Sequence, residues 1–254
     1  MTIYCERRGC GPEIVLIHGW GLHGGIWGDL PERLARDHTV TVVDLPGHGR
    51  SRGTVRAAGL ADFTEAVAAV APSSATWLGW SLGGLIAMDA ALRHDGRVAR
   101  LVLVASTPKF VVAADWPHAM TAETFAGFAA GLGSDYRAML QRFLSLQVSG
   151  DESGRELLRR LRAELLAHGE PEPAMLAAGL AMLEHTDLRA RLPEIRVPTL
   201  VLHGRNDRLA WPAAGEYLAA RIPGARGVTF AGAGHAPFLS QPQRFEQTLR
   251  EFLR

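Results

Sequence analysis

Short apolar runs, many of them β-branched, alternate with helical stretches along most of the chain. One such run, Ile14-Val15-Leu16-Ile17, precedes a glycine-dense loop, and another, Leu101-Val102-Leu103-Val104, follows a small-residue helix. Buried runs of this kind between helices are typical of a parallel sheet that is covered on both faces. We therefore predict an α/β fold with a mostly parallel, doubly wound sheet. The expected strands are 2–7, 14–17, 39–43, 76–79, 101–104, 197–202 and 227–230, and the expected core helices are 26–36, 60–70, 82–94, 213–221 and one from 241 onward.

The pattern changes between residues 108 and 186, where no strand-like run occurs and the apolar spacing is helical throughout. We predict an all-helical cap inserted late in the sheet, because strand-like runs resume only after it. The expected units are a core of residues 1–107 and 187–254 and a cap of residues 108–186. The expected cap helices are 121–132, 135–146, 152–168 and 173–184.

Composition excludes several classes of protein. Of the 254 residues, 47% are hydrophobic and 21% charged, and the formal net charge is +1, which favours a soluble globular protein without affinity for nucleic acid or membrane surfaces. The two cysteines, Cys5 and Cys10, do not form a disulfide framework. No signal-peptide core and no apolar run of ~18 residues is present. We therefore expect a cytoplasmic protein.

The segment Gly79-Trp80-Ser81-Leu82-Gly83 lies between an expected strand and an expected helix. A serine at such a sharp turn is exposed at the sheet edge, and the N-terminus of the following helix favours an oxyanion there. Side chains at the glycine positions would crowd the turn. We predict that Ser81 is a nucleophile; the alternative is a glycine-rich turn with a bystander serine.

A serine nucleophile needs a base, and the base needs an orienting acid. Asp207 and His235 each follow a late strand, at the edge where reactive groups gather in such sheets. Taken alone, Asp207 fits a turn or helix cap and His235 fits an ordinary loop histidine. Their order, Ser81, Asp207, His235, is that of the α/β-hydrolases. We predict that the three form a catalytic triad.

The oxyanion hole follows from the same arrangement. One donor is expected to be the backbone N–H of Leu82, directly after the nucleophile, and the other to come from the loop after the first central strand. That loop is His18-Gly19-Trp20-Gly21, and we expect Trp20 N–H to be the donor. A glycine-rich turn that serves chain reversal is the alternative.

These motifs resemble those of α/β-hydrolase esterases, as does Asp44-Leu45-Pro46-Gly47-His48-Gly49-Arg50-Ser51. More specifically, the chain resembles the family of pimeloyl-acyl-carrier-protein methyl ester esterases of biotin synthesis. The distinguishing segments are residues 18–22, 77–84, 142–147 and 235–238.

The resemblance implies substrate contacts and a docking surface. The implied substrate-binding residues are Trp20, Ser81, Leu82, Phe143, Leu144, Ser145, Leu146, Gln147 and His235. Arg142, Arg155 and Arg159 fall on positions at which that family contacts its acidic carrier protein. Arg155, Arg159 and Arg162 share one helix face, but Glu152, Glu156 and Glu164 interleave with them, so a merely solvated face is the alternative. Arg137 is followed by Ala138, which departs from the family pattern.

We therefore expect a serine carboxylesterase that releases methanol from pimeloyl-acyl-carrier-protein methyl ester, without a metal or cofactor. The partner is the acyl-carrier protein, and the protein is expected to be a monomer. A general short-chain carboxylesterase or lactone hydrolase, and a non-catalytic ligand receptor with a hydrolase fold, are the alternatives.

Overall fold

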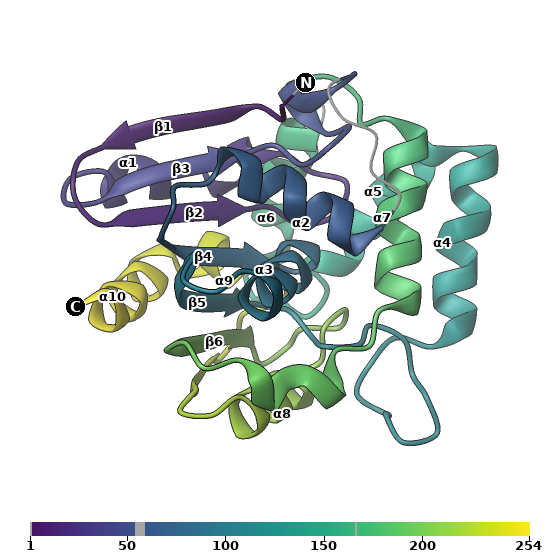
Figure 1. The fold of residues 1–254 in the computed structure, drawn as a ribbon. Coiled ribbons are helices and arrows are strands. Elements are labelled where there is room, and N and C mark those ends of the chain that lie inside the picture. The colour runs from purple at the N-terminus through teal and green to yellow at the C-terminus, as the bar shows by residue number, and fades with distance from the viewer. Residues whose placement is uncertain (1, 54–58, 166) are drawn as a thin grey trace.

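The computed structural model describes residues 2–53, 59–165 and 167–254, and within them seven strands form one sheet (Figure 1). The strand order is β1-β3-β2-β4-β5-β6-β7. β1 is antiparallel to β3, and all other neighbouring strands are parallel. This confirms the predicted fold class. The strands are β1 (Cys5–Gly9), β2 (Glu13–Ile17), β3 (Thr39–Val43), β4 (Ala75–Trp80), β5 (Val98–Val104), β6 (Thr199–Gly204) and β7 (Arg226–Phe230).

The central strands are buried along their length, as the apolar runs predict. All residues of β3, β4 and β6 are buried, whereas exposure alternates along the edge strand β1. The parallel register aligns the carboxyl ends: Ile17 pairs with Gly79, Trp80 with Val104, and Val104 with Leu202. The loops that follow these strands therefore emerge at one edge of the sheet.

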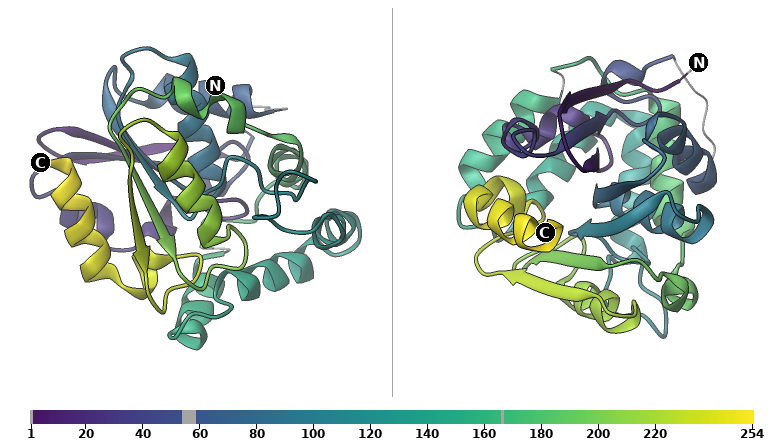
Figure 2. Two further views of the ribbon diagram at one scale, coloured as in Figure 1. Left: turned by 90° about the horizontal axis from the view of Figure 1, so that it is seen from below. Right: turned by 60° about the vertical axis from the view of Figure 1, so that its left-hand side comes forward.

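Helices cover both faces of the sheet (Figures 1 and 2). α1 and α10 lie on one face, and α2, α3 and α8 lie on the other. Three short 3-10 helices and the short helix α9 complete the core within the part of the chain that the structure describes. The bounds are η1 (Gly24–Trp27), α1 (Leu30–Leu34), η2 (Gly49–Ser51), α2 (Leu60–Val70), α3 (Leu82–Arg93), η3 (Arg189–Glu194), α8 (Pro212–Arg221), α9 (Pro237–Ser240) and α10 (Pro242–Leu253).

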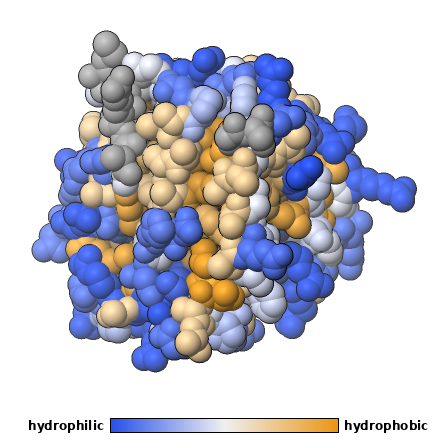
Figure 3. All heavy atoms as spheres, turned by 90° about the vertical axis from the view of Figure 1, so that its right-hand side faces the viewer, coloured by the Kyte–Doolittle hydropathy of each residue, from blue (hydrophilic) through white to orange (hydrophobic). Residues whose placement is uncertain are grey.

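The described residues between β5 and β6 form four further helices, which lie beyond the carboxyl ends of the parallel strands (Figure 1). Figure 3 views this side of the molecule, where apolar side chains gather in the centre and hydrophilic ones surround them. One apolar core runs continuously from the sheet into these helices. The expected helix 152–168 ends earlier, and its residue 166 lies outside the described residues. The cap helices are α4 (Ala122–Ser134), α5 (Tyr136–Gln147), α6 (Gly154–Leu165) and α7 (Pro173–His185).

Two further predicted elements differ from the structure in ways that have a clear physical reason. The single helix expected over 26–36 is split into η1 and α1, because Gly28 has a positive φ of 55° and Pro31 occupies the first turn of α1. The first strand begins at Cys5 rather than Thr2, and its register is set by antiparallel pairing with β3. Among the described residues, no helix combines the length and the apolar character needed to cross a membrane.

Candidate active site

Ser81 occupies a strained turn between β4 and α3. Its φ is 56° and its ψ is −117°, a backbone conformation that side-chain-bearing residues rarely adopt. A Cβ atom on Gly79 would collide with the backbone of Gly83, and one on Gly83 with the carbonyl of Ile17. The Ser81 N–H donates to the Val104 carbonyl at 2.9 Å. The surrounding backbone therefore imposes the turn and requires glycine at both flanking positions.

Asp207 and His235 lie side by side beyond β6 and β7. Nδ1 of His235 lies 2.8 Å from Oδ2 of Asp207, and both residues are buried. Oδ1 of Asp207 accepts the backbone N–H groups of Leu209 and Ala210 at 2.8 and 3.1 Å. The carboxylate therefore caps its own turn and contacts the imidazole at the same time. The pairing places a proton on Nδ1 and leaves Nε2 as an acceptor.

The remaining ring nitrogen of His235 is free. Nε2 is buried and has no hydrogen-bond partner among the described residues, and within those residues Ser81 Oγ makes no hydrogen bond to it. Such bonds are often long in unliganded enzymes and tighten when substrate binds. The structure thus brings Asp207 and His235 into contact, and it leaves the base nitrogen of His235 unpaired in the buried site.

Trp80, the residue before Ser81, connects two segments of the site. One is the turn of residues 79–83 that carries Ser81 (the elbow), and the other is the loop of residues 231–235 that follows β7 and ends at His235 (the histidine loop). Its indole Nε1–H donates to the His235 carbonyl at 2.8 Å, and the two rings lie 5.6 Å apart between centroids. Ser106 Oγ–H donates to the Ser81 carbonyl at 2.9 Å from the other side. These contacts hold Ser81 and His235 in one local framework.

The loop after β2 contains the expected oxyanion donor, Trp20. His18 Nε2 accepts the Leu45 N–H at 2.9 Å, so the proton lies on Nδ1, which donates to the Gly19 carbonyl at 2.8 Å. Because a trans peptide points its N–H opposite to its carbonyl, this bond orients the Trp20 N–H. The other expected donor, Leu82 N–H, belongs to the first residue of α3.

Buried histidines and an aspartate hold this loop in place. Burial lowers the pKa of His18 to about 3 and that of His48 to about 4, so both rings are neutral. Burial alone would raise the pKa of Asp44, but hydrogen bonds from the Arg50 side chain and backbone and from Gly24 N–H outweigh it and set the value at about 2. Asp44 is therefore ionised, and it accepts the backbone N–H groups of Gly24 and Arg50, which joins the loop after β2 to the loop after β3.

The Trp20 side chain contacts the cap. Its indole N–H donates to the Leu176 carbonyl of α7 at 2.9 Å. Its ring meets Phe143 of α5 edge-on at 4.9 Å between centroids, and Phe143 in turn lies 5.7 Å from Phe128 of α4. A continuous series of aromatic contacts thus runs from the loop after β2, which contains Trp20, to the cap helices α5 and α4.

The implied substrate stretch 143–147 divides over different faces of α5, because successive helical residues turn by about 100°. Phe143 faces Trp20, and the Gln147 carbonyl accepts the His235 N–H at 3.1 Å. Leu144 is fully buried in the core, and the Ser145 hydroxyl donates to the Gln141 carbonyl of the preceding turn. The structure therefore brings Phe143 to Trp20 and the Gln147 carbonyl to the backbone of His235, whereas Ser145 and Leu146 line a separate pocket.

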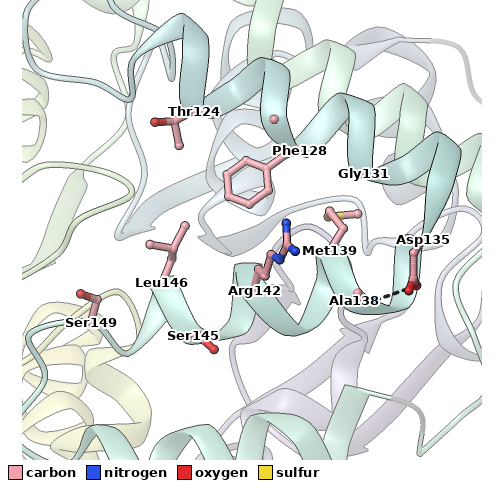
Figure 4. A pocket seen from close by; sticks show the side chains of 11 residues that line it. Thr124, Phe128, Gly131, Asp135, Ala138, Met139, Arg142, Ser145, Leu146 and Ser149 are labelled. Carbon is pink, nitrogen blue, oxygen red and sulfur yellow. Dashed lines mark hydrogen bonds between the residues drawn. The ribbon is translucent and has the colours of Figure 1, made fainter.

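That pocket lies between α4 and α5 and has a volume of about 610 Å³ (Figure 4). Phe128 and Met139 form an apolar wall, and the Arg142 side chain extends toward them. Ser145, Leu146 and Ser149 line it from α5 and the following turn. The pocket thus combines an apolar wall with one cation, Arg142, and one carboxylate, Asp135.

The three cap arginines are exposed on α5 and α6. Across the described parts of the chain, no carboxylate forms an ion pair with Arg142, Arg155 or Arg159. Arg137 differs, because it pairs with Glu170. In the same described regions, no cluster of His, Cys, Asp and Glu is arranged to hold a metal ion.

Comparison with known proteins agrees with this geometry. The model of the alpha/beta hydrolase family matches residues 14–248. An esterase from Exiguobacterium antarcticum has the same fold, with a TM-score of 0.89 and 26% sequence identity over 98% of this chain and 94% of its own. The chain belongs to the alpha/beta hydrolase family.

Two curated relatives of this chain carry the name of one kind of esterase. A protein of Xanthomonas oryzae pv. oryzae is 46% identical over 99% of this chain and 98% of its own length. One of Nitrosomonas europaea is 44% identical over 96% of both chains. Both relatives are named pimeloyl-[acyl-carrier protein] methyl ester esterase. The resemblance identified from the motifs is confirmed, and the protein is an esterase.

Several contacts at the site have no signal in the sequence. Trp80 and Ser106 support the elbow, and Gln147 and Asp151 contact the histidine loop through long-range hydrogen bonds. His18 and Asp44 lie in motifs that the sequence does single out, but their hydrogen-bond partners depend on the folded loops.

Proposed function

We propose that the protein hydrolyses the methyl ester of pimeloyl-acyl-carrier protein to the free acid and methanol, through an acyl-enzyme on Ser81. The observation that carries this proposal is the buried Asp207–His235 pair, in which His235 Nε2 has no hydrogen-bond partner among the described residues. Trp80, the residue before Ser81, donates to the His235 carbonyl and so joins this pair to the turn at Ser81. The ester class comes from the relatives, whose printed name gives the substrate.

In the first step, His235 Nε2 takes the Ser81 proton while Oγ attacks the ester carbonyl carbon. Asp207 keeps the imidazole in the Nδ1–H tautomer and stabilises its cationic form. The N–H groups of Trp20 and Leu82 donate hydrogen bonds to the developing oxyanion; loss of one such donor typically costs about 10²–10³ in turnover. His235 then protonates the departing methoxide, and methanol leaves.

In the second step, His235 takes a proton from water, which attacks the Ser81 ester. The tetrahedral intermediate collapses, Ser81 regains its proton from His235, and the pimeloyl acid, still bound to the carrier protein, is released. One chain supplies every group in this scheme, so we expect a monomer to suffice.

The acyl chain needs a path from the surface to Ser81. We place it along the pocket between α4 and α5 and the aromatic contact from Phe128 through Phe143 to Trp20. Apolar walls suit a seven-carbon chain, and Leu146 adds to them. We assign to Gln147, whose Oε1 is buried and without a hydrogen-bond partner among the described residues, the role of a polar substrate contact.

The carrier protein is expected to dock on Arg142, Arg155 and Arg159. Arginine suits carboxylates and phosphates on an acidic partner, and these three side chains are exposed without carboxylate partners in the described chain. The intramolecular ion pairs that a solvated helix face would form are not present at these positions.

The test compares dicarboxylate monomethyl esters, free and carrier-bound, at equal concentration. We expect kcat/KM to be much higher for the carrier-bound pimeloyl ester, with methanol and free carrier-bound acid formed in equal amounts. Equal kcat/KM for free short-chain esters or lactones would contradict the proposal and favour a general carboxylesterase. No acyl turnover with any ester, including p-nitrophenyl acetate, would favour a ligand receptor.

A further inference from the structure

The turn between α5 and α6, residues 148–153, packs against both loops that carry the predicted acid and base. Together with Gln147, the last residue of α5, it contacts the residue before Asp207 and three residues of the loop that ends at His235. Four hydrogen bonds join this segment to the two loops: Asn206 Nδ2–H to the Gly150 carbonyl (2.8 Å), Glu152 N–H to the Gly232 carbonyl (3.1 Å), Gly234 N–H to Asp151 Oδ2 (2.7 Å) and His235 N–H to the Gln147 carbonyl (3.1 Å).

Asp151 supplies the one cap side chain among these four bonds. Its Oδ2 accepts the N–H of Gly234, the residue directly before His235, at 2.7 Å. Its Oδ1 accepts the Ser153 N–H at 2.8 Å, which fixes the carboxylate within its own turn. Hydrogen bonds to an ionised acceptor are shorter and stronger than neutral ones. The Asp151 carboxylate is therefore fixed by its own turn through Oδ1 while it binds the histidine loop through Oδ2.

The backbone of His235 is thereby held from two sides. On the cap side, the consecutive N–H groups of Gly234 and His235 donate to Asp151 and Gln147. On the core side, the His235 carbonyl accepts from the Trp80 indole. The imidazole position depends on this backbone, and displacement of a catalytic group by about 1 Å can lower the rate about 100-fold.

We infer that Asp151 is a positioning residue, which acts through Gly234 to hold His235 in reach of Ser81 and Asp207. This inference rests on the catalytic roles given above to Ser81, Asp207 and His235. It assigns the cap a part in the chemical step, in addition to substrate binding. A cap residue of this kind influences every ester that the enzyme hydrolyses, including esters too small to contact the cap.

The experiment measures kcat and KM for p-nitrophenyl acetate with Asp151→Ala and Asp151→Asn. Asparagine keeps an oxygen that accepts the Gly234 N–H, and alanine does not. We expect Asp151→Ala to lower kcat about tenfold or more with KM within about twofold of wild type, and Asp151→Asn to retain at least about a third of wild-type kcat. Glu156→Ala, an exposed acidic position on α6, is the matched control and is expected to match wild type.

A wild-type kcat in Asp151→Ala, or equal losses in Asp151→Ala and Asp151→Asn, would overturn the inference, as would a change in KM alone. Thermal unfolding of each variant shows whether it is folded. Should Asp151→Ala not fold, Asp151→Ser replaces it, because its shorter hydroxyl does not reach Gly234, and the same expectations apply. Wild-type turnover of p-nitrophenyl acetate without turnover of the carrier-bound ester would contradict the proposed function and leave this inference standing.

Discussion

The indole Nε1–H of Trp80 donates a 2.8 Å hydrogen bond to the carbonyl oxygen of His235, which joins the residue before the proposed nucleophile, Ser81, to the residue proposed as the base. The sequence separation of the two residues is 155. The same tryptophan packs against Phe238, just beyond the histidine, at 5.2 Å between centroids. The elbow and the histidine loop are therefore one packed unit, and changes in either are expected to affect catalysis in both steps.

Replacement of Trp80 by phenylalanine removes this hydrogen bond and keeps an aromatic ring in the core. A buried carbonyl left without a partner costs about 1–3 kcal/mol. We expect kcat for p-nitrophenyl acetate to fall about tenfold and the melting temperature to fall by several degrees. Trp77→Phe, at a buried position of the same strand, controls for loss of indole volume. Equal kcat values in Trp80→Phe and wild type would show that this bond does not position His235.

Asp207→Asn tests the role of the acid. An amide at this position can donate to the imidazole and so favours the wrong tautomer, which in serine proteases lowers kcat about 10⁴-fold. We expect a loss of that order for the carrier-bound ester near neutral pH, with KM little changed. Circular dichroism checks that the variant is folded, which we expect because the amide oxygen can still accept the Leu209 and Ala210 N–H groups. A loss of less than about tenfold would argue against Asp207 as the orienting acid.

Much of the architecture was predictable because burial on both sides of a parallel sheet requires apolar, β-branched runs. Thr39–Val43 and Leu60–Val70 begin and end where the pattern indicates. The prediction of a single helix over 26–36 was wrong. The apolar spacing continues through Gly28, but the helical backbone ends there because Gly28 has a positive φ. The same limit applies to the first strand, whose bounds depend on its pairing with β3.

The chain order of Ser81, Asp207 and His235 was visible because each follows a strand at the same sheet edge. Contacts such as Asp151 to Gly234 join segments far apart in sequence, and no local pattern marks them. The five consecutive residues 143–147 have different surroundings, because helical geometry turns them to different faces of α5. Phe143 contacts Trp20 and the Gln147 carbonyl accepts the His235 N–H, whereas Leu144 is buried in the core and Ser145 and Leu146 line the pocket between α4 and α5. Their separate roles depend on how α5 packs.

Stability is expected to increase with pH between about 4 and 6.5. Burial lowers the pKa of His18 to about 3 and those of His48 and His203 to about 4, from an ordinary value of 6.5. Between these values the unfolded state binds more protons, so the free energy of unfolding rises with pH, by on the order of 1 kcal/mol per pH unit for each histidine, and levels off above about pH 7. Asp44, with its pKa lowered to about 2, adds in the same direction below pH 4.

Urea unfolding from pH 4.5 to 8 measures this dependence. His203→Leu is expected to reduce the slope, whereas His185→Gln, at an exposed position, is expected to leave it unchanged. A free energy of unfolding that is constant over this range, or that falls as pH rises, would contradict the neutral state of the buried histidines.

The docking surface is tested by Arg155→Ala combined with Arg159→Ala. Exposed charge pairs contribute little individually, about 0.2–1 kcal/mol each, so we expect KM for the carrier-bound ester to rise about fivefold with kcat retained. Added salt is expected to raise KM in wild type and to have a smaller effect in the double variant. Arg137→Ala, whose side chain pairs with Glu170, is the matched control. Unchanged kinetics in the double variant would remove α6 from the docking surface.

The central claim is that Ser81 cleaves a methyl ester on an acyl chain delivered by a carrier protein. The most direct measurement quantifies methanol released from pimeloyl-acyl-carrier-protein methyl ester by wild type and by Ser81→Ala, together with binding of the carrier to each. We predict one methanol per ester for wild type, and no methanol but retained carrier binding for Ser81→Ala. Continued release of methanol by Ser81→Ala, or no release by wild type, would contradict the account.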